Sequence, residues 1–340
     1  RGWAGPQFAA SYRPVLRTGN DIRDVDICTT PGTQTPIAMV KDSAELRTRK
    51  MNMDTMEFSA SVVVATTTAR SASICALPDD TALVFVADST AGLSKAYKST
   101  SDGATWAAWS DDIFPDGQPA NTPTSFRVRY QEGQMIAVYE TSASGGEITT
   151  YSSADFGQTF QAVSTFAGTA VGLGVTKAGT AIISYTAKRD PSDPSSPDDM
   201  FVKRLGASFA RADSASAITV QTSYDPISTS IHADDDGRIY LLSYENDVAF
   251  NHRVEVRVSD DDGRSWRLLD NSPIGDSTSG SATNVVPTRS QMTTAEGMGF
   301  VVSAFPHDTA GDIAGCPHHL RLDQLCTRHD SHREDPARGY

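Results

Sequence analysis

The chain has 340 residues, of which 39% are hydrophobic and 21% charged, and its formal net charge is −13 at pH 7. This composition can build a core, and an acidic excess of this size makes nucleic acid and anionic membrane surfaces poor partners. No apolar run approaches the roughly 20 residues of a membrane-spanning helix, so we expect a soluble protein without membrane insertion. The chain starts at Arg1 without a basic and then apolar segment, so we expect a processed chain or a fragment.

Short runs rich in Val, Ile, Tyr and Phe follow one another along the chain, and Gly, Pro, Asp and Ser separate them. No stretch has a sustained helical period. A turn residue between two strand-like runs recurs at intervals of about 50 residues, the period of a four-stranded propeller blade. These residues are Gly32, Asp80, Gly133, Gly179, Gly237 and Gly297. The sequence therefore predicts an all-β fold, a six-bladed β-propeller with four-stranded antiparallel blades.

The repeat also predicts the domain organisation. We expect one domain over residues 1–340. Its blades are predicted at approximately 20–60, 70–112, 122–166, 170–213, 226–270 and 285–330. The segment 10–17 lies outside the repeat, while the sixth repeat has no recognisable outer strand. Because a propeller has to remove its open sheet edges, we expect this N-terminal strand to close the last blade.

One phrase recurs within the repeat. Residues 153–160 and 259–266 both read Ser-x-Asp-x-Gly-x-Thr/Ser-aromatic, and residues 99–106 keep the frame with the acid one place later. The Gly can take the positive φ of a tight turn, and the acid and hydroxyl side chains can bond to turn amides. The aromatic residue can pack between blades. We therefore assign structural roles to Asp102, Asp155, Asp261, Trp106, Phe160 and Trp266.

This phrase resembles the Asp-box, or bacterial neuraminidase, repeat, and the chain is similar to the sialidase-like superfamily of β-propellers. The resemblance covers residues 99–266 by motif and nearly the whole chain by period. In that family the boxes lie on the face away from the active site, so the resemblance implies a binding mouth at the opposite face. Sialidases bind the substrate carboxylate with three Arg side chains, and they use a Tyr nucleophile activated by a Glu together with an Asp acid/base.

The catalytic set is poorly matched here. Arg23 falls about where the family has an Arg-Ile-Pro phrase, but the Pro is absent and an acid follows. The remaining candidates are chosen by residue type at the expected mouth, where guanidinium groups suit a carboxylate. The catalytic candidates are Arg23, Arg189, Arg253, Tyr244 and Glu245, with Arg129 as a further arginine and Tyr139 and Glu140 as a second phenol and base. The predicted binding residues are Glu140, Arg189 and Glu245.

The four cysteines suggest neither a cofactor nor a metal. Cys28 and Cys75 stand in matching phrases of two repeats, where buried thiols are expected rather than a disulfide. Cys316 and Cys326 can close a small loop by a disulfide. Their His-rich surroundings match no common zinc spacing, so we expect no metal site and no cofactor.

The box phrases and the repeat match the family pattern well, whereas the catalytic residues match it poorly. This contrast favours a non-catalytic propeller. We expect a structural module or one that binds a glycan or a protein, alone or within a larger assembly, outside the cell or on a virion surface. The alternative is a sialidase-like exo-glycoside hydrolase. Fold alone does not decide between them, so the sequence leaves open whether the chain is an enzyme.

Overall fold

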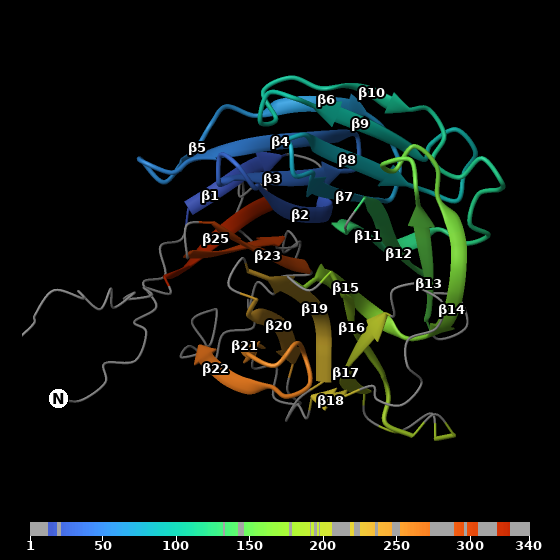
Figure 1. Ribbon diagram of the computed structural model, residues 1–340, viewed down its shortest axis with the longest axis vertical. Coiled ribbons are helices and arrows are strands. Elements are labelled where there is room, and N and C mark those ends of the chain that lie inside the picture. Colours follow the sequence, from blue (N-terminus) through green and yellow to red (C-terminus); the bar gives the residue numbers. More distant parts are fainter. Residues whose placement is uncertain are drawn as a thin grey trace, which may run out of the picture.

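The computed structural model is an all-β propeller, as the repeat predicts. It describes residues 13–18, 22–131, 133–141, 146–176, 179–190, 192–193, 196, 198–205, 218–220, 225–234, 237–246, 252–272, 289–295, 298–304 and 318–326. Antiparallel sheets surround a common centre when the molecule is viewed down its shortest axis (Figure 1). Over these residues, no helix has the length and apolar character needed to cross a membrane.

Each sheet is built from strands that follow one another in the sequence, with one exception at the chain ends. The first sheet contains β2 (Ile22–Thr30), β3 (Thr35–Asp42), β4 (Glu45–Asn52), β5 (Glu57–Phe58) and β6 (Val62–Thr66). The second contains β7 (Ser71–Ala76), β8 (Ala82–Ala87), β9 (Lys95–Ser99) and β10 (Ala107–Ser110). The third contains β11 (Pro123–Gln131), β12 (Gln134–Thr141), β13 (Glu147–Ser153) and β14 (Gln161–Ala167).

The remaining sheets follow the same plan. One contains β15 (Thr169–Val175), β16 (Ala181–Lys188), β17 (Asp198–Leu205) and β18 (Ile218–Val220). The next contains β19 (Asp225–Ala233), β20 (Ile239–Asn246), β21 (His252–Ser259) and β22 (Arg267–Ser272). The last combines β1 (Arg13–Thr18) with β23 (Arg289–Ala295), β24 (Met298–Ala304) and β25 (His318–Cys326).

The expectation of six four-stranded blades is wrong. Within the described residues the structure has five four-stranded blades, and the sheet that begins with β2 has five strands instead. Two short strands, β5 and β6, share the place of the outer strand in this sheet, because both pair with β4. The chain turns back after Asn52 to form the short β5, and β6 then pairs with the other half of β4. The segment Glu57–Phe58 is therefore a short strand of its own.

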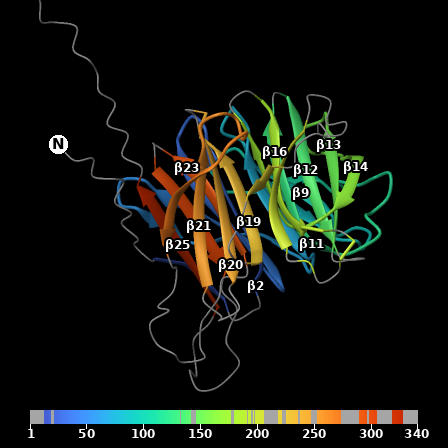
Figure 2. The ribbon, with the colours of Figure 1, turned by 90° about the horizontal axis from the view of Figure 1, so that it is seen from below.

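The innermost strands form the wall of a central channel. In ring order they are β2, β7, β11, β15, β19 and β23, and each packs against the next, with β23 returning to β2. Figure 1 shows these strands around the centre of the molecule, and Figure 2 shows the sheets from the side. Because side chains alternate along a strand, every second residue of an inner strand can face the channel.

The recurring phrase forms a tight turn between the third and fourth strands of a sheet. In residues 153–160, Ser153 Oγ donates to Asp155 Oδ1 at 2.6 Å and accepts from the amide of Gly157 at 2.9 Å. The amide and hydroxyl of Thr159 donate to the Asp155 carboxylate at 2.9 and 2.7 Å. The side chains thus satisfy the backbone groups of the turn that the strand ladder leaves unpaired.

The second copy repeats this network, and the third modifies it. Asp261 accepts from the amide and hydroxyl of Ser265 at 2.8 and 2.6 Å, and these hydrogen bonds lower the pKa of Asp261 to about 2. In residues 99–106, Ser101 takes the acid's place and accepts from the amide of Thr105 at 3.0 Å. Asp102 instead occupies the next position, with a positive φ of 50°. We call residues 99–106, 153–160 and 259–266 the box turns.

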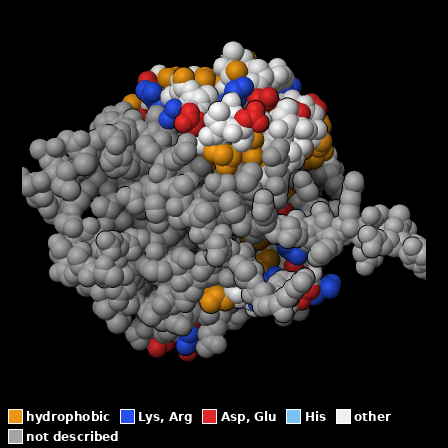
Figure 3. Space-filling model, turned by 90° about the vertical axis from the view of Figure 1, so that its left-hand side faces the viewer, with side chains coloured by type: hydrophobic (Ala, Val, Ile, Leu, Met, Phe, Trp, Pro, Cys, Tyr) orange, Lys and Arg blue, Asp and Glu red, His pale blue; other side chains and the backbone are white. Residues whose placement is uncertain are grey.

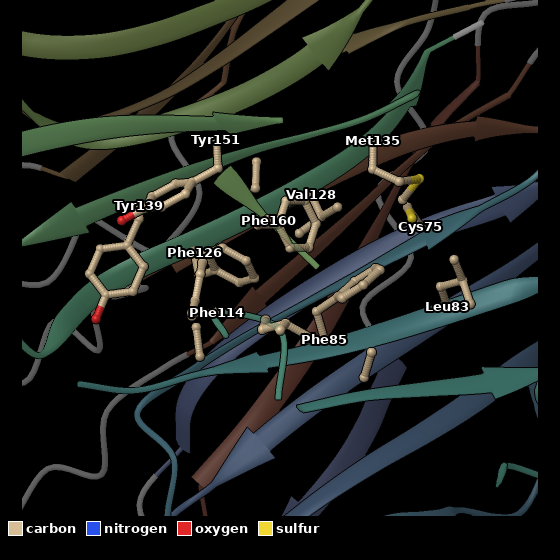
Figure 4. Packing of buried hydrophobic residues seen from close by; sticks show 14 of the residues in the cluster. Cys75, Leu83, Phe85, Phe114, Phe126, Val128, Met135, Tyr139, Tyr151 and Phe160 are labelled. Carbon is tan, nitrogen blue, oxygen red and sulfur yellow. The ribbon is translucent and has the colours of Figure 1, made fainter. Parts of the chain in front are cut away.

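The closing aromatic residue of each box turn packs against a neighbouring sheet. Phe160 is buried and meets Phe85 of β8 edge to face, with ring centroids 5.7 Å apart (Figure 4). Trp106 Nε1 donates to Thr48 Oγ1 of β4 at 3.0 Å. Trp266 packs on the cluster that contains Ile182 and Ile239. These aromatic residues join blades that no backbone ladder connects.

The two ends of the described chain meet in one sheet. β1 pairs antiparallel with β25, and Arg13 lies opposite Leu322 and Thr18 opposite His318. The sheet order is β1-β25-β24-β23, so β1 covers an edge of β25 that would otherwise present unpaired backbone groups.

We expect deletion of residues 1–18 to lower the melting temperature by several degrees, because the deletion removes β1 and exposes the edge of β25. Thermal unfolding followed by circular dichroism measures the effect. Deletion of residues 1–10 leaves β1 whole and serves as the control. An unchanged melting temperature for the longer deletion would show that β1 contributes nothing to the closure of this sheet.

Candidate functional site

The channel has two distinguishable ends. The turn between β2 and β3 lies beside box turn 99–106, since Thr33 Oγ1 donates to Asp102 Oδ1 at 3.4 Å. The inner strands therefore end on the side of the box turns, which we call the box end. They begin at the opposite side, the mouth end, where the sequence places the candidate site.

Near the mouth end, a buried ion pair crosses the channel from β2 to β11. Arg127 donates through Nη2 to Asp24 Oδ1 at 2.9 Å and through Nη1 to Asp24 Oδ2 at 3.1 Å. Asp24 is 0% and Arg127 1% exposed. The intervening strand β7 contributes the amide of Ala72, 3.1 Å from Asp24 Oδ2, and the hydroxyl of Ser71, which donates to the same oxygen. Burial acts to lower the pKa of Arg127, but the charge of Asp24 outweighs it and raises the pKa.

Two residues further along each strand, the same arrangement recurs. Arg129 Nη2 donates to Asp26 Oδ1 at 3.0 Å and Nη1 to Asp26 Oδ2 at 3.1 Å. Ser73 Oγ and the amide of Ile74 donate to Asp26 Oδ2 at 2.6 and 3.1 Å. We call the two layers the Asp-Ser-Arg ladder. Both arginines are held in bidentate pairs inside the protein, a geometry that uses a guanidinium's strongest contacts.

The other half of the channel wall carries no such ladder within the described residues. Gly172 and Gly174 bring β15 close to β19, since a Cβ on Gly172 would lie 3.0 Å from Ser230 Cα. A Cβ on Gly174 would lie 3.0 Å from the Ile231 carbonyl oxygen. Ser230 Oγ in turn donates to Gln291 Oε1 at 3.2 Å. Backbone approach and neutral hydrogen bonds close this half of the channel.

At the mouth end, polar side chains bind local backbone. Lys41 is buried, and its Nζ donates to the carbonyl oxygens of Asp42 and Thr67, the latter at 2.8 Å. Burial lowers the pKa of Lys41 to about 8, and the charge of Arg23 acts in the same direction. Asp88 Oδ2 accepts from the amide of Arg70 at 3.0 Å. These groups fix the loops that lead into and out of the inner strands.

The predicted residues Arg23, Glu140 and Arg189 also have intramolecular partners. Arg23 Nη1 donates to the Thr68 carbonyl oxygen at 2.9 Å. Glu140 accepts from Thr124 Oγ1 at 2.8 Å and from the amide of Val171 at 3.0 Å, and so links β12 to β15 of the next sheet. Arg189 forms a bidentate pair with Asp199, with Nε and Nη2 at 2.8 and 2.7 Å from the two carboxylate oxygens.

The predicted phenols and the third arginine divide into two groups. Tyr139 is buried, its hydroxyl donates to the Asn121 carbonyl oxygen at 2.7 Å, and burial raises its pKa. Tyr244 and Glu245 lie on β20 and Arg253 lies on β21. In the register of these two strands, the backbone of Glu245 lies opposite that of Arg253. The side chains of these last three residues lie outside the described part of the structure.

Sequence reasoning missed a cavity at the box end, where the Asp-Ser-Arg ladder stops. It has a volume of about 180 Å³, and inner strands from all around the channel contribute to its wall. Its lining includes Thr29, Gln34, Arg129, Tyr130, Gly174 and His232. The thiols of Cys28 and Cys75 also line it; both are free and buried, and burial raises the pKa of each. We call this space the box-end cavity.

The described residues contain no metal centre, and the part of the surface that Figure 3 colours carries charges of both signs. No group of three or more His, Cys, Asp or Glu side chains in the described part of the chain is placed to hold a metal ion. Cys316 and the His-rich segment that follows Cys326 lie outside the described residues. In the coloured part of Figure 3, acidic and basic side chains are interspersed with hydrophobic ones.

No family model matches the sequence, and a search of curated proteins finds no match. Solved structures do resemble the fold. A protein of unknown function from Dyadobacter fermentans is 10% identical with a TM-score of 0.60, over 95% of this chain and 99% of that one. An α-L-arabinanase from Penicillium chrysogenum, complexed with arabinobiose, is 11% identical with a TM-score of 0.61, over 94% and 98%. A sialidase from Streptococcus pneumoniae is 10% identical with a TM-score of 0.64, over 92% and 70%. At these identities the likeness establishes the fold alone.

We expect Arg127→Met to cost about 3–5 kcal/mol of folding free energy, because it leaves the buried charge of Asp24 unpaired. The double variant with Asp24→Asn removes both charges and should lose less than the two single variants together. Urea unfolding of the four proteins in this cycle measures the coupling. Additive losses would show that the two side chains do not stabilise each other.

His232 provides a pH-dependent prediction. Burial lowers its pKa to about 3, and the nearby charge of Arg129 acts in the same direction while Asp26 opposes it. Between about pH 3 and pH 6.5 the unfolded chain binds more protons at this residue than the folded one, so stability falls as the pH falls through this range. Between pH 7 and pH 5 we expect the wild type to lose about 1–2 kcal/mol more than His232→Gln. Equal losses in urea unfolding at the two pH values would contradict the prediction.

Proposed function

We propose that this chain is a non-catalytic β-propeller that binds a glycan or a protein partner. The observation that carries the proposal is the pairing of the channel arginines. Arg127 and Arg129 are occupied by Asp24 and Asp26, so neither is free to receive a substrate carboxylate. Arg23 and Glu140 at the mouth end are likewise bound to the protein's own groups.

We also infer that the box turns are Asp-boxes and that residues 1–340 form one domain. The hydrogen bonds of Asp155 and Asp261 support the first inference, and the shared sheet of β1 and β25 supports the second. The expected setting, outside the cell or on a virion surface and alone or within a larger assembly, belongs to this proposal. The predicted binding residues Glu140, Arg189 and Glu245 all remain predictions.

The rival function is glycoside hydrolysis, and the named relatives in fold favour it. They include sialidases and an α-L-arabinofuranosidase from Fusarium graminearum whose structures were solved as enzymes or enzyme–inhibitor complexes. For this chain, a sialidase-like reaction would use Tyr244 with Glu245 as the nucleophile pair, which was chosen by residue type at the expected mouth. A general acid would have to come from an Asp of the first two sheets, and those at the mouth end, Asp24, Asp42 and Asp88, are bound within the fold.

The test combines binding with turnover. Purified protein is applied to a glycan array, used to capture proteins of known identity in a pull-down, and incubated with fluorogenic sialosides and arabinofuranosides. We expect reproducible binding in one of the first two assays and no glycoside turnover. Turnover that Tyr244→Phe or Glu245→Gln abolishes would establish the hydrolase and overturn the proposal. Blank results in both binding assays would also count against it.

A further inference from the structure

The box-end cavity has the size of a small-ring site. Its volume is about 180 Å³, whereas a cavity of roughly 150 Å³ in another protein accommodates one benzene ring. Sites for drug-sized ligands are larger, about 300–1,000 Å³. The cavity therefore fits one six-membered or five-membered ring with its substituents, and longer ligands would extend from it into solvent.

The lining mixes polar and apolar side chains and carries no net charge. Arg129 is its one permanently charged residue, and Asp26 neutralises that charge through a bidentate pair. His232 has its pKa lowered to about 3 and is neutral at physiological pH. Thr29 and Gln34 are further polar residues of the wall, and Ile27 and Val175 are among its apolar ones. A ligand rich in hydroxyl groups and without charge matches this lining, because burying an unpaired charge there would be costly.

An aromatic pair extends the cavity wall to the surface. Tyr130 lines the cavity and stacks on Phe156, with ring centroids 6.4 Å apart and planes 9° apart. The Tyr130 hydroxyl accepts from the amide of Gly133 at 2.8 Å, which fixes the ring. Phe156 is 42% exposed. A flat exposed aromatic surface beside a polar cavity can pack against the apolar C–H face of a sugar ring.

The residue at position 156 is not explained by its turn. It occupies the left-handed position of box turn 153–160, with φ of 55°, where a bulky side chain is an outlier. The corresponding residues of the other two box turns are Asp102 and Asp262, with φ of 50° and 62°. Asp suits this conformation better than Phe does. The turn thus tolerates a polar residue, and the exposed Phe156 stacks on Tyr130, which lines the cavity.

We propose that the box-end cavity binds a single ring of a neutral carbohydrate, with Tyr130 and Phe156 as an aromatic rim. This inference rests on the proposed function in its glycan-binding form, and it places the glycan at the end of the channel opposite to the predicted mouth. It also excludes an anionic sugar as the preferred ligand.

The probes are methyl glycosides of arabinose, galactose, glucose and N-acetylglucosamine, with methyl sialoside as the anionic comparison. Each is titrated into the full chain and read by saturation-transfer NMR. We expect saturable binding of at least one neutral glycoside and none of the sialoside. Two variants should each weaken that binding about tenfold or more: Phe156→Asp, which installs the residue of the other box turns, and Ala76→Leu, which fills the cavity from its wall.

Two controls separate the site from the fold. Leu268→Asp replaces another exposed hydrophobic residue, on β22, and should bind as the wild type does. Melting temperatures of all variants show whether a loss of binding reflects unfolding. If Phe156→Asp melts early, Ala76→Leu still tests the cavity.

The outcomes distinguish the two proposals. If both cavity variants bind as the wild type does and the mouth-end variant Glu245→Ala no longer binds, the cavity site is overturned. Glycan binding by the protein would then still stand. Preferential binding of the sialoside would overturn the neutral-ligand inference. If no glycoside binds here and the glycan array is also blank, glycan binding itself fails along with the cavity site.

Discussion

The Asp-Ser-Arg ladder is the constraint on which the channel depends. A buried carboxylate needs a partner, and Asp24 and Asp26 find theirs on a strand 103 residues later in the sequence. A bidentate Arg–carboxylate pair tolerates little displacement, and hydroxyls and amides of β7 lie between the two partners. The ladder therefore fixes the first three sheets relative to one another. It also fixes strand register, because a slip of one residue would turn these side chains away from the channel.

The same ladder decides what the channel can do chemically. A ring of inner strands with free guanidiniums would offer a site for an anionic ligand, but here the cationic charge is matched inside the protein by acids of β2. On the other side of the ring, Gly172 and Gly174 let β15 approach β19 until little space is left. The box-end cavity lies where the ladder stops at Arg129. Its position follows from the way in which the channel is filled.

The propeller could be predicted because its turns are marked by single residues. The site could not, because it depends on pairs of residues that lie far apart in the sequence. Gly and Asp mark turns by their own backbone preferences, so the repeat could be read from single residues such as Asp80 and Gly133, both of which have positive φ. The division between β5 and β6 is not marked by a Gly or Pro, and the prediction of four strands in every blade failed there.

The ladder did leave a trace in the sequence. Three pairs of residues stand at alternating positions of three successive repeats: Asp24 and Asp26, Ser71 and Ser73, and Arg127 and Arg129. Without coordinates, nothing in that pattern distinguishes channel-facing charges from solvated ones. The mouth residues show a related limit of local signals: residue types at strand ends do not reveal that Glu140 and Arg189 have partners within the protein.

A structural turn and a binding surface can occupy the same few residues. In box turn 153–160 the hydroxyl of Ser153 and the carboxylate of Asp155 hold the backbone, and the equivalent groups do so in residues 259–266. The residue after the acid takes no part in that network through its side chain in either of these turns. Its left-handed backbone is set by the turn, while its identity varies between Phe156 and Asp262. The side chain at this position makes different contacts in the two turns, since Asp262 pairs with Arg204 and Phe156 stacks on Tyr130. A position with a fixed backbone and a variable side chain can acquire a recognition role at little cost to the fold, in line with the general observation that sites are carried by loops on a rigid scaffold. The box turns therefore combine a fixed backbone with a residue that differs from turn to turn, which is the property that the proposed site at Phe156 uses.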